Sequence, residues 1–304
     1  MVWFSIAIIA PFLYALTNFI DKILLEKYFK QSGVGTLILF SSLLSILALP
    51  FAFFMDPTVL SVSGKNILIL CSVGILNILV LWCYLQALKD EEASIVIVFY
   101  QLVPVFGYGL GYFILGEVLT ITQIIAMAIV ILGTTIISLE IDSENRFKLR
   151  KKTILPMVCA SFFWASSSVI FKVAALEENV WRSFFWENLT LVVLGIFIFI
   201  FVRSYRTSFV VAIKNNSKPI LFLNGLNETI YMIGNLMISV SIMIAPVALV
   251  LLVNSFQTIF VLVIGIILTI FLPGIVVEKI HAKNVWQKVI AILITGIGTY
   301  LLTF

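Results

Sequence analysis

Apolar runs fill this chain almost from end to end, and each is long enough to cross a lipid bilayer. About 20 apolar residues are needed for a helical crossing, and ten such segments are predicted as helices, at 3–25, 33–55, 66–88, 93–115, 118–139, 153–175, 181–203, 217–240, 245–271 and 284–303. The composition agrees, because 11% of the residues are charged where soluble domains carry about 25%. With short links, the sequence predicts an all-α integral membrane protein of ten transmembrane helices without a separate soluble domain.

The basic residues gather on one side of this predicted bundle. Sixteen of the 19 lysines and arginines lie on the links after odd-numbered segments, whereas Lys65, Lys172 and Arg182 lie on the other side. By the positive-inside rule the richer side faces the cytoplasm, so both termini are expected outside. No basic region precedes the first apolar run, so we expect no cleavable signal. The longest basic link, 203–218, is expected to be a loop whose centre at 209–213 lies on the membrane surface.

The two halves of the chain repeat each other. Lys22 aligns with Lys172 at an offset of 150 residues, Asn77 with Glu228 at 151, and a further match follows at 165 after an insertion around 271–277. Each half has five segments, an odd number, so the second half enters the membrane from the opposite side. The sequence therefore predicts two five-helix repeats of inverted topology, 1–150 and 151–304, around a central cavity.

One acidic residue lies near the centre of the run at 217–240. Asn224, Glu228, Tyr231 and Asn235 are spaced i, i+4, i+7 and i+11, so a helix places them on one face. An ionised side chain at that depth costs about 2.5–3.5 kcal/mol on insertion scales, so Glu228 has to face protein or a wet cavity. It is either a packing residue bonded to neighbouring asparagines or part of a substrate or proton site, and we adopt the second interpretation.

Other segments carry polar or aromatic groups at similar depth, which predicts a polar chamber at mid-membrane. The candidate substrate-binding residues are Glu228, Asn224, Tyr231, Asn235, Asn77, Tyr84, Tyr14, Asn18, Tyr100, Gln101, Trp164, Asn254 and Gln257. Asp21, near the cytoplasmic end of the first segment, is a gating candidate. Glu187, on a segment predicted to be peripheral, is expected to contact Arg182 or lipid headgroups.

The first half contains several short motifs, which are Tyr84-Leu-Gln-Ala-Leu88, Ala93-Ser94, Leu102-Val-Pro-Val-Phe106, Leu115-Gly-Glu117 and Gly133. The second half keeps Ala245-Pro246 but has no Leu-Gly-Glu. On these residues the chain resembles the EamA-type, ten-helix members of the drug/metabolite transporter superfamily. The resemblance implies a cavity lined by segments 1, 3, 4, 6, 8 and 9 that is used for alternating access, and no cofactor. Such proteins are usually drawn with cytoplasmic termini, whereas the charges here indicate the reverse, and we follow the charges.

These patterns favour a secondary transporter of the cytoplasmic membrane that moves a small polar or amphipathic metabolite. One carboxylate among tyrosines, a tryptophan and amides suits a cationic amine, through charge pairing and cation–π contact. The same carboxylate is alternatively the carrier of a coupling proton. A flippase or transporter for a lipid-linked or nucleotide-linked sugar is the second hypothesis, although the missing midplane lysine or arginine argues against a phosphate-bearing substrate.

An intramembrane enzyme is the hypothesis from another class. The serines at 166–168 could supply a nucleophile, but no histidine or lysine is placed to activate them. The three cysteines and the lone His281 have no metal-ligand spacing, so no catalytic residue and no metal are expected. A purely structural or receptor-like bundle would not need polar groups at one depth. The expected partners are a small-molecule substrate and the lipid bilayer, not nucleic acid, and the protein is expected to be a monomer or weak homodimer.

Overall fold

The computed structural model describes residues 2–29, 33–90, 93–138, 151–271 and 285–301. Within those ranges every regular element is helical and no residue lies in a strand. Seven helices of the described residues are long and apolar enough to cross a bilayer. The chain is therefore an integral, multi-pass membrane protein, as predicted. The seven are Val2–Tyr28, Val34–Met55, Gly64–Lys89, Thr153–Glu177, Val180–Phe201, Lys218–Ile244 and Val247–Leu268.

The helices follow one another with short links. In chain order they are α1 (Val2–Ala7), α2 (Ile9–Ile23), α3 (Val34–Leu44), α4 (Ala48–Met55), α5 (Gly64–Asp90), α6 (Ala93–Val98), α7 (Val103–Leu110), α8 (Ile121–Ser138), α9 (Lys151–Glu177), α10 (Val180–Phe201), α11 (Arg203–Ile244), α12 (Val247–Val253), α13 (Gln257–Phe271) and α14 (Val285–Leu301). Five short turns of other helix types join or end them: η1 (Leu24–Tyr28) and η4 (Gly111–Leu115) are π-helical, and η2 (Ser45–Leu47), η3 (Phe99–Leu102) and η5 (Asn254–Phe256) are 3₁₀.

The three other predicted segments are helical but shorter. Phe99–Leu115 and Ile121–Gly133 are apolar helices below the length of a full crossing, and α14 has 17 residues. The count of ten crossings and the inverted repeat therefore stay predictions. The insertion at 271–277, His281 and the basic residues at 146–150 fall wholly or mostly outside the described residues.

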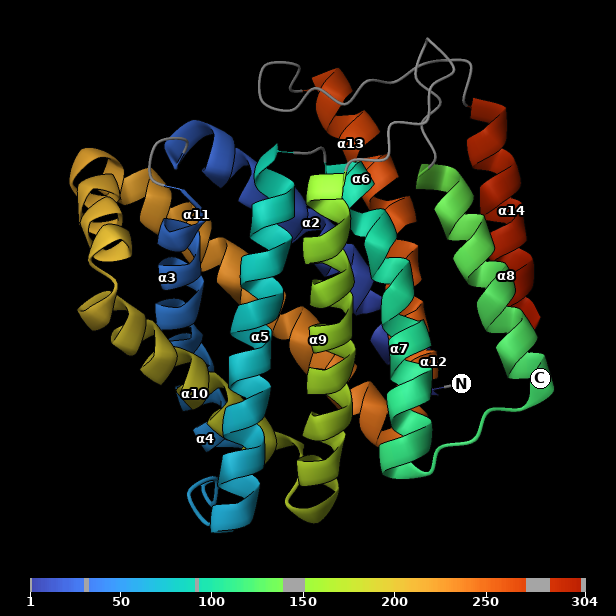
Figure 1. The fold of residues 1–304 in the computed structure, drawn as a ribbon, viewed down its shortest axis with the longest axis horizontal. Helices are drawn as coiled ribbons and strands as arrows, with labels where there is room; N and C mark the ends of the chain where they lie inside the picture. Colours follow the sequence, from blue (N-terminus) through green and yellow to red (C-terminus); the bar gives the residue numbers. More distant parts are fainter. Residues whose placement is uncertain (1, 30–32, 91–92, 139–150, 272–284, 302–304) are drawn as a thin grey trace.

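The basic link at 203–218 is not a loop, and that prediction was wrong. It forms the first turns of α11, which runs on into the predicted crossing with Pro219 inside the helix. Figure 1 shows α11 changing direction after these turns (upper left), as expected where a proline removes a backbone donor. The ring of Phe209 lies 4.5 Å, centroid to centroid, from that of Phe40 on α3. These turns are therefore held against protein.

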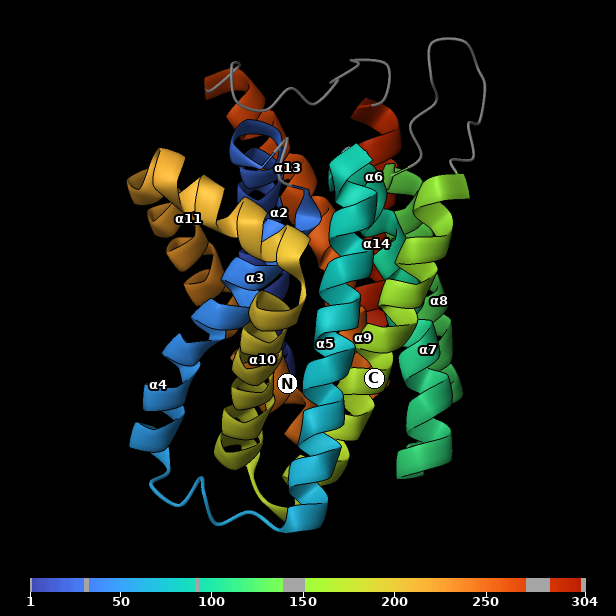
Figure 2. The same cartoon turned by 60° about the vertical axis from the view of Figure 1, so that its left-hand side comes forward.

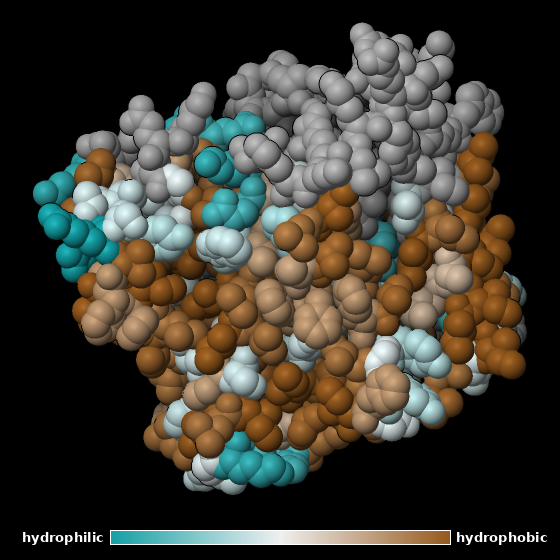
Figure 3. Space-filling model, in the orientation of Figure 1, coloured by the Kyte–Doolittle hydropathy of each residue, from teal (hydrophilic) through white to brown (hydrophobic). Residues whose placement is uncertain are grey.

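The long helices form one bundle with an apolar outer surface. In Figure 1, α5 and α9 lie side by side at the centre, α11 crosses behind them, and α8 and α14 pair at one edge; Figure 2 again shows α5 beside α9. The visible face in Figure 3 is brown over its middle, and teal gathers at the upper left and at the bottom. A helix of 27 residues such as α5 is about 40 Å long, enough to span the apolar middle with polar ends in the headgroup layers.

Small residues let several of these helices approach closely, as is usual between helices in lipid. A Cβ atom built on Gly74 of α5 would lie 2.7 Å from the Cβ and Cγ2 atoms of Thr190 and 3.2 Å from the carbonyl oxygen of Glu187. A Cβ atom on Gly225 of α11 would meet nothing within 4 Å. The α5–α10 contact therefore depends on a missing side chain, whereas Gly225 has room for one.

We predict that Gly74→Ala destabilises the protein and that Gly225→Ala does not. The added methyl group has to push α10 away from α5, which costs about 1–3 kcal/mol in a well-packed interior, while alanine at Gly225 suits a helix at least as well as glycine. The measurement is the thermal unfolding midpoint of each purified variant in the same detergent. Equal midpoints for the two variants would show that α5 and α10 are not in close contact.

The orientation also has a direct test. Lys65 and Lys214 are both exposed, and the elements that carry them, the start of α5 and the first turns of α11, lie toward opposite ends of the bundle in Figure 1. Because the positive-inside rule places the end with Lys65 outside, a cysteine at Lys65 should react with an impermeant thiol reagent on whole cells. A cysteine at Lys214 should react only after the cells are opened. The reversed labelling pattern would place both termini in the cytoplasm.

Candidate functional site

A cavity lies inside the bundle and draws its walls from both halves of the chain. It encloses about 860 Å³ of space between atoms, including the part open to solvent. Its walls are formed by Tyr14, Thr17, Asn18, Asp21, Ser41, Ser42, Ser45, Asn77, Ile78, Val80, Leu81, Tyr84, Tyr100, Trp164, Leu191, Asn227, Glu228, Tyr231 and Gln257. Small-molecule sites commonly lie between the helices of a bundle, where a few polar groups converge in a largely apolar hollow, and this cavity has that character.

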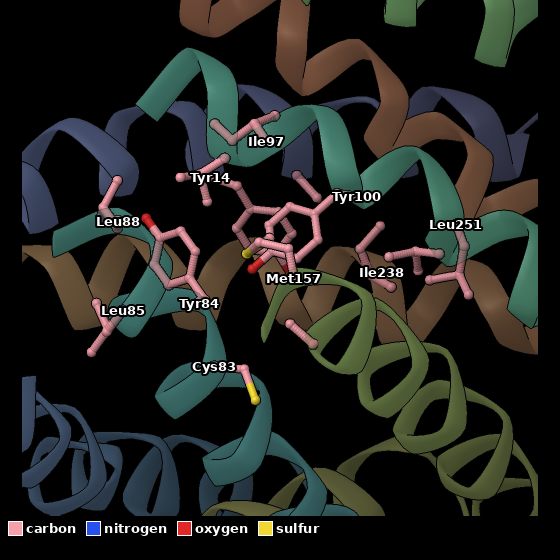
Figure 4. Close-up of a cluster of buried hydrophobic side chains, with 14 of the residues drawn as sticks. Tyr14, Cys83, Tyr84, Leu85, Leu88, Ile97, Tyr100, Met157, Ile238 and Leu251 are labelled. Carbon is pink, nitrogen blue, oxygen red and sulfur yellow. The ribbon is translucent and has the colours of Figure 1, made fainter. Parts of the chain in front are cut away.

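Aromatic rings form one wall of this cavity. The ring of Trp164 on α9 stands edge-on to those of Tyr14 and Tyr100, with centroids 5.9 and 4.9 Å away. Tyr231 lies 5.5 Å from Tyr14, and Tyr84 lies 6.1 Å from Tyr100. Figure 4 shows Tyr14, Tyr84 and Tyr100 meeting between three helices. Five rings from α2, α5, η3, α9 and α11 thus gather around one space.

Asp21 belongs to the cavity and is held by a neighbouring helix. The amide nitrogen of Asn227 on α11 donates to its Oδ1 atom at 2.7 Å, and the side chain of Asp21 is buried. One helical turn earlier, the Oδ1 atom of Asn18 accepts a hydrogen bond from the Tyr84 hydroxyl at 2.8 Å. The spacing of Asn18 and Asp21 on α2 therefore turns both side chains toward α5 and α11.

Glu228 lies on the same cavity, also buried, as the sequence predicted. The Ser45 hydroxyl lies 3.4 Å from its Oε1 atom and 3.0 Å from the Ser41 carbonyl oxygen. The hydrogen bond from Ser45 to Glu228 is therefore weak, because 3.4 Å is beyond the usual range. The carboxylate of Glu228 is therefore turned toward η2 and the cavity, and it is less firmly held than that of Asp21.

Glu187 was assigned wrongly from the sequence, because it contacts neither Arg182 nor the surface. Its side chain is 3% exposed, and its Oε1 atom accepts hydrogen bonds from the amides of Asn77 at 2.6 Å and Asn235 at 3.3 Å. Asn77 itself lines the cavity. Glu187 thus stands directly behind the cavity wall, as a third buried carboxylate, and α10 is not peripheral.

Ten of the predicted binding and gating residues line the cavity and four do not. Tyr14, Asn18, Asp21, Asn77, Tyr84, Tyr100, Trp164, Glu228, Tyr231 and Gln257 line it. Asn224 instead donates to the Ile220 carbonyl of its own helix at 2.7 Å, and Asn235 donates to Glu187. Gln101 and Asn254 are buried and do not line the cavity. Substrate binding by any of these residues stays a prediction.

The sequence did not predict that the second segment, at 33–55, contributes side chains to the cavity wall. Ser41, Ser42 and Ser45 on α3 and η2 line the cavity, and so do Thr17 and Asn227. Serine and threonine occur often between apolar helices, so their presence alone gave no signal. The signal for Asn227 was available, because it lies one residue before Glu228 and three residues after Asn224 in the same predicted crossing.

A buried ion pair links the halves at the end of the bundle predicted to lie outside. Gly116, at φ +67°, ends η4 in a left-handed turn that glycine adopts without strain, and Glu117 follows it. The Glu117 carboxylate accepts from Lys172 Nζ at 2.6 Å and from the Val247 backbone amide at 2.8 Å, and Lys172 also donates to the Ala245 carbonyl at 2.8 Å. This geometry explains the Leu-Gly-Glu motif.

Outside the crossings, Asp56 ties the link after α4 to the start of α10. Its carboxylate accepts from the Thr58 backbone amide at 2.8 Å, from the Thr58 hydroxyl and from the Asn179 amide at 2.9 Å, and it lies 3.4 Å from Arg182. The hydrogen bonds from Thr58, followed by those from Asn179, lower the pKa of Asp56 to about 2. A lowered pKa stabilises the folded state above the unfolded value near 3.9, and this contribution is lost as the pH falls toward 2.

Residues 1–139 match the EamA-like transporter family. The resemblance to EamA-type drug/metabolite transporters is thereby confirmed on the first half, and it indicates a membrane transporter of that type. No curated protein sequence matches the chain. One solved structure, titled only "Crystal structure of protein", has a TM-score of 0.55 at 14% identity over 96% of each chain, so the likeness to it is one of fold across nearly the whole length.

The Glu117–Lys172 pair gives a stability prediction. Both side chains are largely buried, at 11% and 14% exposure, so removing one partner leaves an uncompensated charge that costs about 3–5 kcal/mol. Lys172→Met and Glu117→Gln should each lower the thermal midpoint in detergent, and the double variant should recover a large part of the loss. Lys65→Met is the matched control, because its ion pair with Glu177 is exposed and is worth at most about 1 kcal/mol. Equal losses for Lys65→Met and Lys172→Met would contradict the assignment.

Proposed function

We propose that the chain is a secondary transporter that carries a small organic cation of the amine type across the cytoplasmic membrane by alternating access. The observation that carries this proposal is the charge of the cavity. Asp21 and Glu228 line it, Glu187 stands behind Asn77, and none of its lining residues is a lysine, arginine or histidine.

The energetic argument starts from these carboxylates. Within the bilayer an ionised carboxylate is costly unless it is paired or protonated, and the partners of Asp21 and Glu228 given above are neutral amides and hydroxyls. An ammonium group in the cavity would offset that cost for either acid. A substrate bearing phosphate would instead bring a second negative charge beside them, which disfavours nucleotide-linked and lipid-linked sugars.

The aromatic wall supports the same class of substrate. The faces of tyrosine and tryptophan attract a cation within about 6 Å, by about 0.5–2 kcal/mol according to how dry the site is. Trp164, Tyr14 and Tyr231 lie beside the carboxylates on the same cavity. Their apolar ring surfaces would also bury the hydrocarbon part of an amphipathic amine.

Alternating access is supported by the fact that both halves of the chain contribute residues to the cavity wall. Asn77 of the first half and Glu228 of the second half, which align in the predicted repeat, both line it. A rocking motion of one repeat against the other would therefore open such a cavity alternately to the two sides.

The test begins with a thermal-shift screen of amines, amino acids and sugar conjugates, in which amines are expected to stabilise the purified protein. Glu228→Gln keeps the shape of the side chain and removes its charge. It should fold, and it should bind the amine found in the screen about tenfold to hundredfold less tightly, the loss expected for a hydrogen bond to a charged group. Glu26→Gln is the matched control, because Glu26 is 55% exposed in its pair with Lys22.

The same variant separates two roles for Glu228. If it pairs with the substrate, Glu228→Gln weakens binding at every pH. If it carries the coupling proton, binding survives while uptake driven by a pH gradient into vesicles is lost and exchange without a gradient persists. Stabilisation by sugar conjugates and not by amines would overturn the proposed substrate class.

A further inference from the structure

Two interrupted helices meet beside the cavity. η3 (Phe99–Leu102) breaks the fourth predicted crossing, η5 (Asn254–Phe256) breaks the ninth, and the two turns lie against each other. The hydrogen bonds of a 3₁₀ turn are poorer than those of an α-helix, and such turns inside a helix often mark functional positions. The break in η3 is compensated in part, because the Phe99 carbonyl accepts from the Ser161 hydroxyl at 2.9 Å.

The side chains at this crossing are polar, buried and only partly paired. Gln101, Asn254, Ser255, Gln257 and Thr258 are each 2–4% exposed. Gln101 Nε2 donates to Thr258 Oγ1 at 3.1 Å. Among the described residues no partner exists for four buried oxygens and one buried nitrogen, which are Gln101 Oε1, Gln257 Oε1, Asn254 Oδ1, Ser255 Oγ and Asn254 Nδ2. Four of the five atoms are thus able to bind a cation through oxygen.

Four of these five residues lie within one helical turn, at 254–258, and Gln101 comes from the other half of the chain. Asn254, Gln257 and Thr258 are spaced i, i+3 and i+4, so they share a face of the helix. Ser255 stands three residues before Thr258, and such residues are nearly eclipsed in a 3₁₀ turn. The hydrogen bond to Thr258 brings Gln101 from the other half to the same point. Gln101 of η3 and Thr258 of α13 are thus in contact, and the unpartnered oxygens of Asn254, Ser255 and Gln257 belong to the four residues that precede Thr258.

The chemistry of this set selects a ligand. Leaving a buried polar group unpaired costs about 1–3 kcal/mol, so a group that binds several of these oxygens at once is strongly favoured. All five side chains are neutral, whereas a divalent cation is held by carboxylates. Neutral carbonyl and hydroxyl oxygens at helix breaks in the membrane instead replace the hydration shell of a monovalent metal ion.

We propose that the crossing of η3 and η5, formed by Gln101, Asn254, Ser255, Gln257 and Thr258, is a binding site for a monovalent metal cation, Na⁺ or K⁺. Gln257 also lines the cavity, and it is the one residue of these five that does. It therefore connects the proposed ion site to the cavity. An ion held here would order the two broken helices, which come from opposite halves of the chain, at the edge of the cavity.

The experiment needs no organic substrate, so its outcome does not depend on the proposed function. The thermal midpoint of the purified protein is measured in NaCl, KCl and LiCl at constant ionic strength, with increasing Na⁺ or K⁺ replacing Li⁺. We expect a saturable rise in the midpoint as Na⁺ or K⁺ replaces Li⁺, and the two series identify the ion. Identical midpoints in all three salts would show that ordered water alone fills the crossing, and would overturn the proposal.

A variant then locates the ion. Asn254→Leu has a similar volume and removes two of the unpartnered atoms, so half-saturation should need about tenfold more metal ion or more. Asn188→Leu is the matched control, because Asn188 is equally buried but bonds the Phe184 carbonyl of its own helix at 2.8 Å. Thr258→Val tests the same point should Asn254→Leu not fold. An unchanged ion response in the variants that fold would place the ion elsewhere and overturn the assignment.

Discussion

The structure depends on one constraint, which is that a polar group inside a bundle surrounded by lipid has to find its partners within the protein. The Asp21 carboxylate is held by Asn227, Glu187 by Asn77 and Asn235, and Glu117 by Lys172. Each acid is thereby turned away from lipid, and the helices that carry the partners are fixed around it. Van der Waals contact between apolar helices alone would leave their rotation about their own axes poorly defined.

Three of these four polar contacts join the first half of the chain to the second, and the hydrogen bond from Asn235 to Glu187 lies within the second half. Asn227 reaches Asp21, Asn77 reaches Glu187, and Gln101 reaches Thr258, each more than 100 positions away in the sequence. The cavity lies between the groups so joined, because its walls come from both halves. A motion of one half against the other would have to exchange these hydrogen bonds, whereas contacts within a half, such as Tyr84 to Asn18, would be carried along. The bonds between the halves are therefore where the energetics of a transport cycle would be concentrated.

Much of the site was predictable because the membrane makes polar residues conspicuous. An acid near the centre of an apolar run has few places to go, so Glu228 and its neighbour Tyr231 were correctly placed on a cavity. Asn224 and Asn235 share their helix face but not the cavity, since α11 is tilted and crosses behind α5 and α9 (Figure 1). A regular spacing predicts which residues share a face of a helix. It does not predict how far along that face the cavity extends.

The sequence by itself determined that this chain is an integral membrane protein, that the part of it described by the structure is helical, and roughly where the long helices begin and end. Those properties depend on local hydropathy and on the cost of exposing charge to lipid, and both can be read one helix at a time. Only the tertiary structure decided that Glu187 faces Asn77 and not Arg182, that α3 supplies serines to the cavity, and that Glu117 pairs with Lys172. Each of these depends on how helices distant in sequence are rotated against one another, which is set by many small contacts at once and by no single segment.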